Sequence, residues 1–234
     1  MTWVKICGIT NLEDAQIAVA AGADAVGFVF YEKSPRNVEV HAARELISAL
    51  PREIEKVGVF VQGVGPAPAA VASEVRLSAV QTTVQLDRAW ELRSVLLQTG
   101  FSNPPKYFLS VSADWFLQNH GAATTELVRL QAADQNPVGI AAIFLDSGTL
   151  QQPGGTGRQF NWMKAVPAVE EIRKSGLKLV VAGGLTPENV ADAMRILKPW
   201  GVDVSSGVEA SPAKKDPEKV RAFIAAVRKA DGAA

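Results

Sequence analysis

The sequence predicts an α/β protein folded as one (β/α)8 barrel over residues 1–234. Short apolar runs alternate with helical patterns, and eight of them can be counted in 234 residues. That is roughly 29 residues per unit, about the length of a strand with its crossover helix. Several runs, such as Ile143–Leu145 and Leu179–Val181, are almost entirely β-branched or aromatic, as is typical of parallel strands buried on both faces. No linker divides the units, which favours a barrel over a doubly wound sheet.

Each unit begins with an expected strand. The eight strands are expected at Val4–Ile6, Asp24–Phe30, Lys56–Val61, Ala79–Leu86, Lys106–Val111, Ala141–Leu145, Leu177–Val181 and Val202–Val204.

The helices carry start and stop signals in the sequence. Residues 10–13, Thr-Asn-Leu-Glu, resemble a capping box, and the helix that follows should stop at Gly22. Residues 186–188 and 216–218 each place a capping residue before Pro and an acidic residue. Apolar residues at helical spacing predict a closing helix over Pro217–Ala230.

Composition excludes several classes of function. Lys and Arg number 24 and Asp and Glu number 24, so the formal net charge is zero; a nucleic-acid partner would require a basic excess. No apolar run is long enough to span a membrane, and the first residues do not resemble a signal peptide. One cysteine and two histidines make a metal centre unexpected. We therefore expect a cytoplasmic protein without metal or cofactor.

Three reactive side chains follow expected strands, where barrel enzymes place their catalytic groups. Cys7 precedes a helix start, which could lower its thiol pKa, although a lone strand cysteine is more often a buried apolar residue. Asp146 is either a loop cap or a general acid whose pKa is raised by apolar surroundings. Arg36 is either a solvated loop residue or a residue whose guanidinium group binds a substrate carboxylate through two hydrogen bonds.

Glycine-rich turns follow the last three strands. They contain the candidate phosphate-binding residues Gly157, Gly183, Gly184, Ser206 and Gly207. Any single glycine pair is a turn by default. Three such turns in consecutive late loops favour a phosphate site, because glycine allows close backbone approach and exposed N–H groups can bind phosphate oxygens.

Longer segments resemble the phosphoribosylanthranilate isomerase family of tryptophan biosynthesis, and they occur in the expected order towards both ends of the chain. They are residues 5–10 (KICGIT), 22–30 with 34–36 (GADAVGFVF and SPR), 57–61 (VGVFV), 145–147 (LDS), 154–157 with 160–162 (GGTG and FNW), 182–190 (AGGLTPENV) and 202–208 with Glu209 (VDVSSGV and E).

The resemblance implies a reaction and roles for three residues. The family converts N-(5-phosphoribosyl)anthranilate to 1-(2-carboxyphenylamino)-1-deoxyribulose 5-phosphate by a cofactor-independent Amadori rearrangement. By similarity, Cys7 is the general base, Asp146 the general acid and Arg36 a contact on the anthranilate side. The expected partner is therefore a small phosphosugar–anthranilate substrate, and the expected state is a monomer, with a dimer as the alternative.

One segment departs from the family pattern. After the fourth strand the family usually reads Val-Gln-Leu-His-Gly, but here residues 80–87 are VQTTVQLD. Alignment on the first Val-Gln places Thr83 where the histidine belongs, and alignment on the second places Asp87 there. His120 is too distant in sequence to substitute simply.

Two alternatives remain at this point. One is another ribose-phosphate barrel enzyme. The histidine-pathway Amadori isomerase is expected to have an aspartate base where this chain has Cys7. Indole-glycerol-phosphate synthase needs a lysine acid and an extra N-terminal segment. The other is a barrel that binds a phosphate ligand without catalysis. Cys7 and Asp146 weigh against that alternative.

Overall fold

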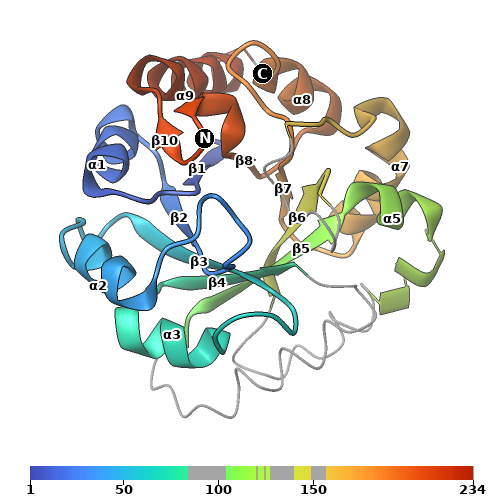
Figure 1. The fold of residues 1–234 in the computed structure, drawn as a ribbon. Coiled ribbons are helices and arrows are strands. Elements are labelled where there is room, and N and C mark those ends of the chain that lie inside the picture. Colours follow the sequence, from blue (N-terminus) through green and yellow to red (C-terminus); the bar gives the residue numbers. More distant parts are fainter. Residues whose placement is uncertain (84–103, 120, 124, 127–139, 149–156, 234) are drawn as a thin grey trace.

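A closed barrel of eight parallel strands forms the centre of the molecule (Figure 1). The computed structural model describes residues 1–83, 104–119, 121–123, 125–126, 140–148 and 157–233. Each strand pairs with the next, and β8 pairs with β1 to close the barrel. The fold prediction is thus confirmed. The strands are β1 (Trp3–Cys7), β2 (Ala25–Val29), β3 (Glu55–Val61), β4 (Ala79–Thr83), β5 (Lys106–Ser112), β6 (Ile140–Asp146), β7 (Leu179–Val181) and β8 (Gly201–Val204).

Helices surround this barrel on the outside (Figure 1). A short hairpin, β9 (Glu209–Ser211) with β10 (Lys214–Lys215), lies between β8 and the closing helix. None of the helices in the described part of the chain is long and apolar enough to cross a membrane. The helices are α1 (Leu12–Ala21), α2 (Val40–Ser48), α3 (Pro68–Val75), α5 (Ala113–Gln118), α7 (Trp162–Lys174), α8 (Val190–Leu197), the 3-10 helix η2 (Ser206–Val208) and α9 (Pro217–Asp231).

The helix ends confirm some of the sequence signals and correct others. Helix α1 ends before Gly22, which adopts the left-handed conformation, and Asp216 caps α9 as predicted. The cap of α1 is Asn11, whose side chain accepts the Asp14 N–H at 2.9 Å, so the predicted capping box is wrong. The Thr10 hydroxyl instead donates to a carbonyl of the hairpin, that of Ala213.

Helix α8 begins later than the sequence predicts. Thr186 was expected to cap it, with Pro187 as the first helical residue. Instead the Asn189 side chain accepts the Thr186 N–H at 2.8 Å and closes a turn, and the helix starts at Val190. The Thr186 carbonyl accepts the N–H groups of both Asn189 and Val190, so residues 187–189 form a turn and the regular helix begins after it.

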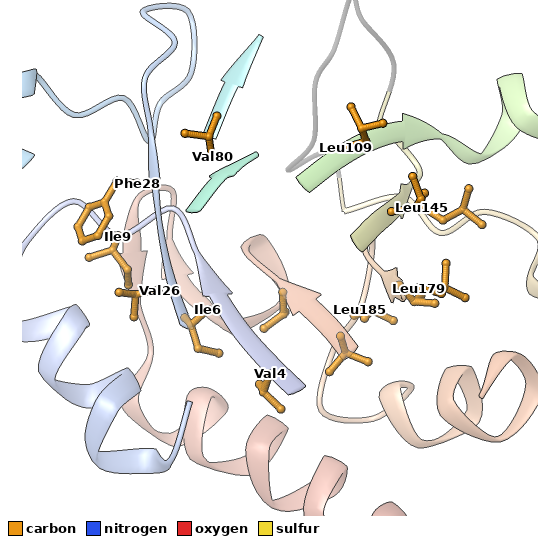
Figure 2. Packing of buried hydrophobic residues seen from close by; sticks show 14 of the residues in the cluster. Val4, Ile6, Ile9, Val26, Phe28, Val80, Leu109, Leu145, Leu179 and Leu185 are labelled. Atoms are coloured by element: carbon orange, nitrogen blue, oxygen red, sulfur yellow. The ribbon is translucent and has the colours of Figure 1, made fainter. Parts of the chain in front are cut away.

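Strand alternation divides the apolar core into two layers. Outward-facing residues, such as Val4, Ile6, Val26 and Phe28, pack between the barrel and its helices (Figure 2). A smaller inner cluster fills the barrel; its buried members are Ala25, Val57, Ala79, Phe108, Ala142, Phe144 and Val180. Trp3 stacks on Trp200 at 5.2 Å beside this cluster. The apolar filling of the barrel leaves polar groups to the carboxyl ends of the strands, where a site can form.

Candidate active site

Cys7 is the last residue of β1 and is buried at the carboxyl end of the barrel. Burial raises the pKa of its thiol, an effect that the Lys5 ammonium opposes and Asp203 reinforces. The expectation of a pKa lowered by a helix N-terminus is therefore wrong in direction. Helix α1 starts only at Leu12, after an intervening turn, and the dipole effect is confined to the first turn of a helix.

A buried ion pair lies beside Cys7. Lys5 is fully buried, and its Nζ is 2.9 Å from Oδ1 of Asp203, its direct neighbour across the β1–β8 pairing. Burial alone would lower the pKa of Lys5, but Asp203 and Cys7 raise it above its ordinary value. Its Nζ also lies 5.2 Å from the centre of the Phe144 ring. The raised pKa favours the charged form of Lys5 inside the barrel.

Asp146 ends β6 on the same rim of the barrel as Cys7. Burial raises the pKa of its carboxyl group, as the sequence predicted for a general acid, and the Gly148 N–H partly opposes that rise. This N–H donates to Oδ1 at 2.6 Å. Asp203 raises the Asp146 pKa further, and Lys5 lowers it. The hydrogen bond orients the carboxyl group, while the environment favours its protonated form.

Arg36 is held at the barrel mouth by a carboxylate from the β9–β10 hairpin. Its Nε and Nη2 donate to the two oxygens of Glu209 at 2.8 and 2.7 Å, and Lys215 contacts the same carboxylate at 2.9 Å. The Arg36 stem covers Gly8, where an added Cβ would lie 2.5 Å from Cδ. Arg36 is 8 % exposed, so the solvated-loop interpretation is wrong. Arg36 and Lys215 thus share one carboxylate, and burial lowers the pKa of Lys215.

The candidate phosphate loops contact one another through their glycines. A Cβ at Gly183, Gly184 or Gly207 would meet neighbouring backbone, not open space for a ligand, which corrects the reason for glycine inferred from sequence at these three positions. Such a Cβ would lie 2.6 Å from N of Ser147 at Gly183, 2.5 Å from C of Arg158 at Gly184 and 3.0 Å from C of Leu185 at Gly207. The loops after β6, β7 and β8 are therefore neighbours, as a shared site requires.

Several donors in these loops are left without acceptors. Within the described residues, the backbone N–H groups of Gly184, Ser206 and Gly207 make no hydrogen bond. The buried hydroxyl of Ser205 likewise has no partner there. Gly157 is exposed with open space at its Cβ position. Unpaired N–H groups on adjoining loops are suited to bind an anion.

The described part of the divergent fourth strand extends to Thr83. Strand alternation places it on the interior face with Ala79 and Gln81, in the place that the first alignment assigns to the histidine. The Gln81 Oε1 atom is buried without a partner among the described residues. The remainder of the predicted strand, residues 84–86, as well as Asp87 and His120, lies outside the described residues.

Four charged residues of this site were missed by the sequence reasoning: Lys5, Asp203, Glu209 and Lys215. A signal existed for the first two, because each is a charge flanked by apolar residues in a strand expected to be buried. A closed barrel makes the first and last strands neighbours, so the two charges could have been paired. Glu209 and Lys215 lie in a hairpin that no sequence pattern predicted.

The fold and the reactive groups on its carboxyl-terminal rim define a (β/α)8-barrel enzyme of the acid–base type. The chain belongs to the N-(5′-phosphoribosyl)anthranilate (PRA) isomerase family, whose model matches residues 4–226. It is 42 % identical over 231 residues to the N-(5′-phosphoribosyl)anthranilate isomerase of Pseudomonas paraeruginosa, covering 96 % of this chain and 94 % of that one.

Two solved structures share this fold. One is a phosphoribosyl anthranilate isomerase in complex with reduced 1-(o-carboxyphenylamino)-1-deoxyribulose 5-phosphate, with a TM-score of 0.70, 35 % identity and coverage of 98 % and 100 % of the two chains. The other is of monomers generated from the dimeric isomerase of Thermotoga maritima, with the same TM-score, identity and coverage. These relatives favour the isomerase over the other ribose-phosphate barrel enzymes considered above.

Proposed function

We propose that this barrel converts N-(5′-phosphoribosyl)anthranilate to 1-(o-carboxyphenylamino)-1-deoxyribulose 5-phosphate in tryptophan biosynthesis, with Asp146 as acid and Cys7 as base. The observation that carries this proposal is the placement of the two groups. They end β6 and β1 on one rim of the barrel, in environments that raise both pKa values. In the closed barrel these strands are separated by β7 and β8, so the two groups lie apart on the rim, as an acid and a base acting on different atoms of a sugar require.

The chemistry requires one group of each kind. Protonated Asp146 donates its proton to the ribose ring oxygen, the C1′–O bond breaks, and the nitrogen lone pair forms a protonated Schiff base. The Cys7 thiolate then removes the C2′ proton, and those electrons form the C1′–C2′ double bond of an enolamine. Tautomerisation of the enolamine gives the ketone product. No electron acceptor or donor enters, so the proposed rearrangement is balanced without a cofactor.

The ends of the substrate would be bound on opposite sides of these groups. The phosphate is assigned to the unpaired N–H groups of Gly184, Ser206 and Gly207, with Gly157 and Gly183 shaping the adjoining loops. The anthranilate carboxylate is assigned to Arg36, whose Nη1 is not used in the pair with Glu209. These assignments place a dianion at neutral N–H donors and a monoanion at a guanidinium.

Turnover can be tested directly. Purified protein mixed with phosphoribosylanthranilate should cause a decay of the substrate's anthranilate fluorescence. A barrel that bound the compound without converting it would leave the fluorescence stable over time, and the proposal would then be wrong. The proposal includes a cytoplasmic location and a single barrel domain over residues 1–234. The expected solution state stays a monomer, with a dimer as the alternative.

Arg36→Met should weaken substrate binding by about 1.5–3 kcal/mol, the range for hydrogen bonds to charged groups. Inhibition by inorganic phosphate should be unchanged, because that anion lacks the aromatic carboxylate. Arg44→Met is a matched control, since the pair that Arg44 forms with Glu74 is exposed. Steady-state kinetics with phosphate as inhibitor measures both quantities. Equal damage to both would place Arg36 at the phosphate end.

Gly184→Ala should raise both KM and the phosphate inhibition constant by about tenfold or more, corresponding to loss of a charged hydrogen bond. The added Cβ would displace the loop from Arg158, and the N–H group would move with it. Gly63→Ala is the control: its φ of +74° imposes similar backbone strain, but nothing lies within 4 Å of its Cβ position. Unchanged phosphate inhibition in a folded Gly184→Ala variant would show that the anion binds elsewhere.

A further inference from the structure

Lys5 and Cys7 face the same space inside the barrel. They are two residues apart on β1, so strand alternation points both side chains inward. A Cβ built on Gly27 of the neighbouring strand β2 would lie 2.8 Å from Sγ of Cys7 and 2.9 Å from Cε of Lys5. Sγ and Cε are therefore separated by no more than the sum of these distances. Gly27 provides the space in which thiol and lysine stem lie together.

Stability alone does not account for this lysine. Removing an ammonium group from water costs several kcal/mol, and a buried ion pair often stabilises a fold no better than apolar residues of equal volume. Apolar side chains fill the adjoining inner cluster, and the pair of Lys5 with Asp203 interrupts them. The cation lies directly beside the thiol that the proposed reaction uses as its base.

We propose that Lys5 is a positioning residue of the isomerase reaction: its buried ammonium group stabilises and orients the Cys7 thiolate, and Asp203 is its counterion. The inference rests on the proposed role of Cys7 as base. Lys5 itself keeps its proton throughout the reaction, because Asp203 holds it in the charged form. When Cys7 takes the C2′ proton, the thiolate charge is neutralised, and the ammonium group returns to its pair with Asp203 alone.

The remaining charges around the thiol do not substitute for Lys5. Lys215 and Arg36 also interact with Cys7, but both are bound to the carboxylate of Glu209. Among all these groups, Lys5 is the largest influence that lowers the Cys7 pKa. The acidic groups on the facing strands are Asp203 on β8, which raises the Cys7 pKa, and Asp146 on β6.

Titration of the thiol tests this inference without reference to turnover. Cys7 is the sole cysteine of the chain, so the ultraviolet absorbance of its thiolate, measured against Cys7→Ser, reports on this group. Lys5→Met should move the titration midpoint to higher pH, with roughly tenfold or more less thiolate at a given pH below it, since each pKa unit is a factor of ten. In the pH profile of kcat/KM, the limb that reports the ionisation of Cys7 should shift to higher pH together with the midpoint of the thiol. KM should change little.

Lys56→Met is the matched control. Lys56 is also a buried strand lysine, but its Nζ donates to the Pro51 carbonyl at the other end of the barrel. Its removal should leave the thiol midpoint in place. Asp203→Asn should move the midpoint the opposite way, to lower pH, because it removes a negative charge next to the thiolate.

A second variant tests the inference if Lys5→Met does not fold. If Lys5→Met leaves Asp203 too costly to bury, the double variant Lys5→Met/Asp203→Asn removes both charges, and the midpoint should still rise. An unchanged or lowered midpoint in a folded variant lacking Lys5 would overturn the inference. Unimpaired turnover in Cys7→Ser would instead refute the base assignment, and the titration would still report whether Lys5 stabilises the thiolate.

Discussion

Asp146→Asn is expected to lower kcat by about 10²–10⁴-fold, the usual contribution of a general acid, while substrate binding stays nearly unchanged. Asparagine has the same shape, and its side-chain oxygen can still accept the Gly148 N–H that orients Asp146. It cannot donate a carboxylic proton to the ring oxygen, so ring opening fails. Fluorescence decay of phosphoribosylanthranilate gives kcat and KM.

The stability of the same variant is its control. Because burial raises the pKa of Asp146 in the folded protein, ionised Asp146 destabilises the fold at pH values above its folded pKa. Asp146→Asn removes that cost, so the variant should melt at an equal or higher temperature at pH 7, and the gain should shrink as pH falls through the folded pKa. A variant that is stable, binds substrate and keeps near-normal kcat would exclude Asp146 as the acid.

The pH dependence of activity follows from the same two environments. Activity requires Asp146 protonated and Cys7 ionised, and burial raises the pKa of each group. Because a carboxyl group ordinarily titrates well below a thiol, the share of this reactive combination is level between the two pKa values. Activity should therefore decline as pH falls below the Asp146 pKa and as pH rises above the Cys7 pKa. Lys5 lowers both values. The ion pair of Lys5 with Asp203 thus acts on acid and base together, although it touches neither reacting atom of the sugar.

The sequence could predict the barrel because its signals are local. Near-continuous apolar runs mark strands buried on both faces, and their spacing leaves room for one helix each. The same regularity located Cys7 and Asp146 at strand ends. Helix starts were less predictable: Thr10 and Asn11 can both cap, and only packing against the hairpin at Ala213 occupies the threonine hydroxyl.

The electrostatic partners could not be read from local patterns. Lys5 and Asp203 are separated by 198 positions, and Arg36 and Glu209 by 173. Their pairing depends on the register of β1 against β8 and on the course of the loop after β2. Sequence reasoning therefore assigned Arg36 to a ligand carboxylate without seeing that a protein carboxylate already occupies one edge of its guanidinium. It also predicted the wrong direction for the Cys7 pKa, because it counted a helix dipole and not burial.

Cys7→Ser is expected to cost about 10²–10⁴-fold in kcat, on the scale of a general base. A serine hydroxyl fits the space but does not ionise at neutral pH, so the C2′ proton has no acceptor. The variant should still bind substrate. The reduced product analogue that is bound to a related isomerase is a suitable probe of this binding. Its dissociation constant should change far less than kcat.

Cys7→Ala separates the two interpretations of this residue. If Cys7 is only a buried apolar residue, alanine, which is also apolar, should preserve turnover better than serine does. If Cys7 is the base, alanine and serine should fail alike, because neither supplies a thiolate beside Lys5. Near-normal kcat in either variant would contradict the assignment. The buried ammonium group would then have no anionic partner on the substrate side, and its presence beneath the barrel mouth would need another explanation.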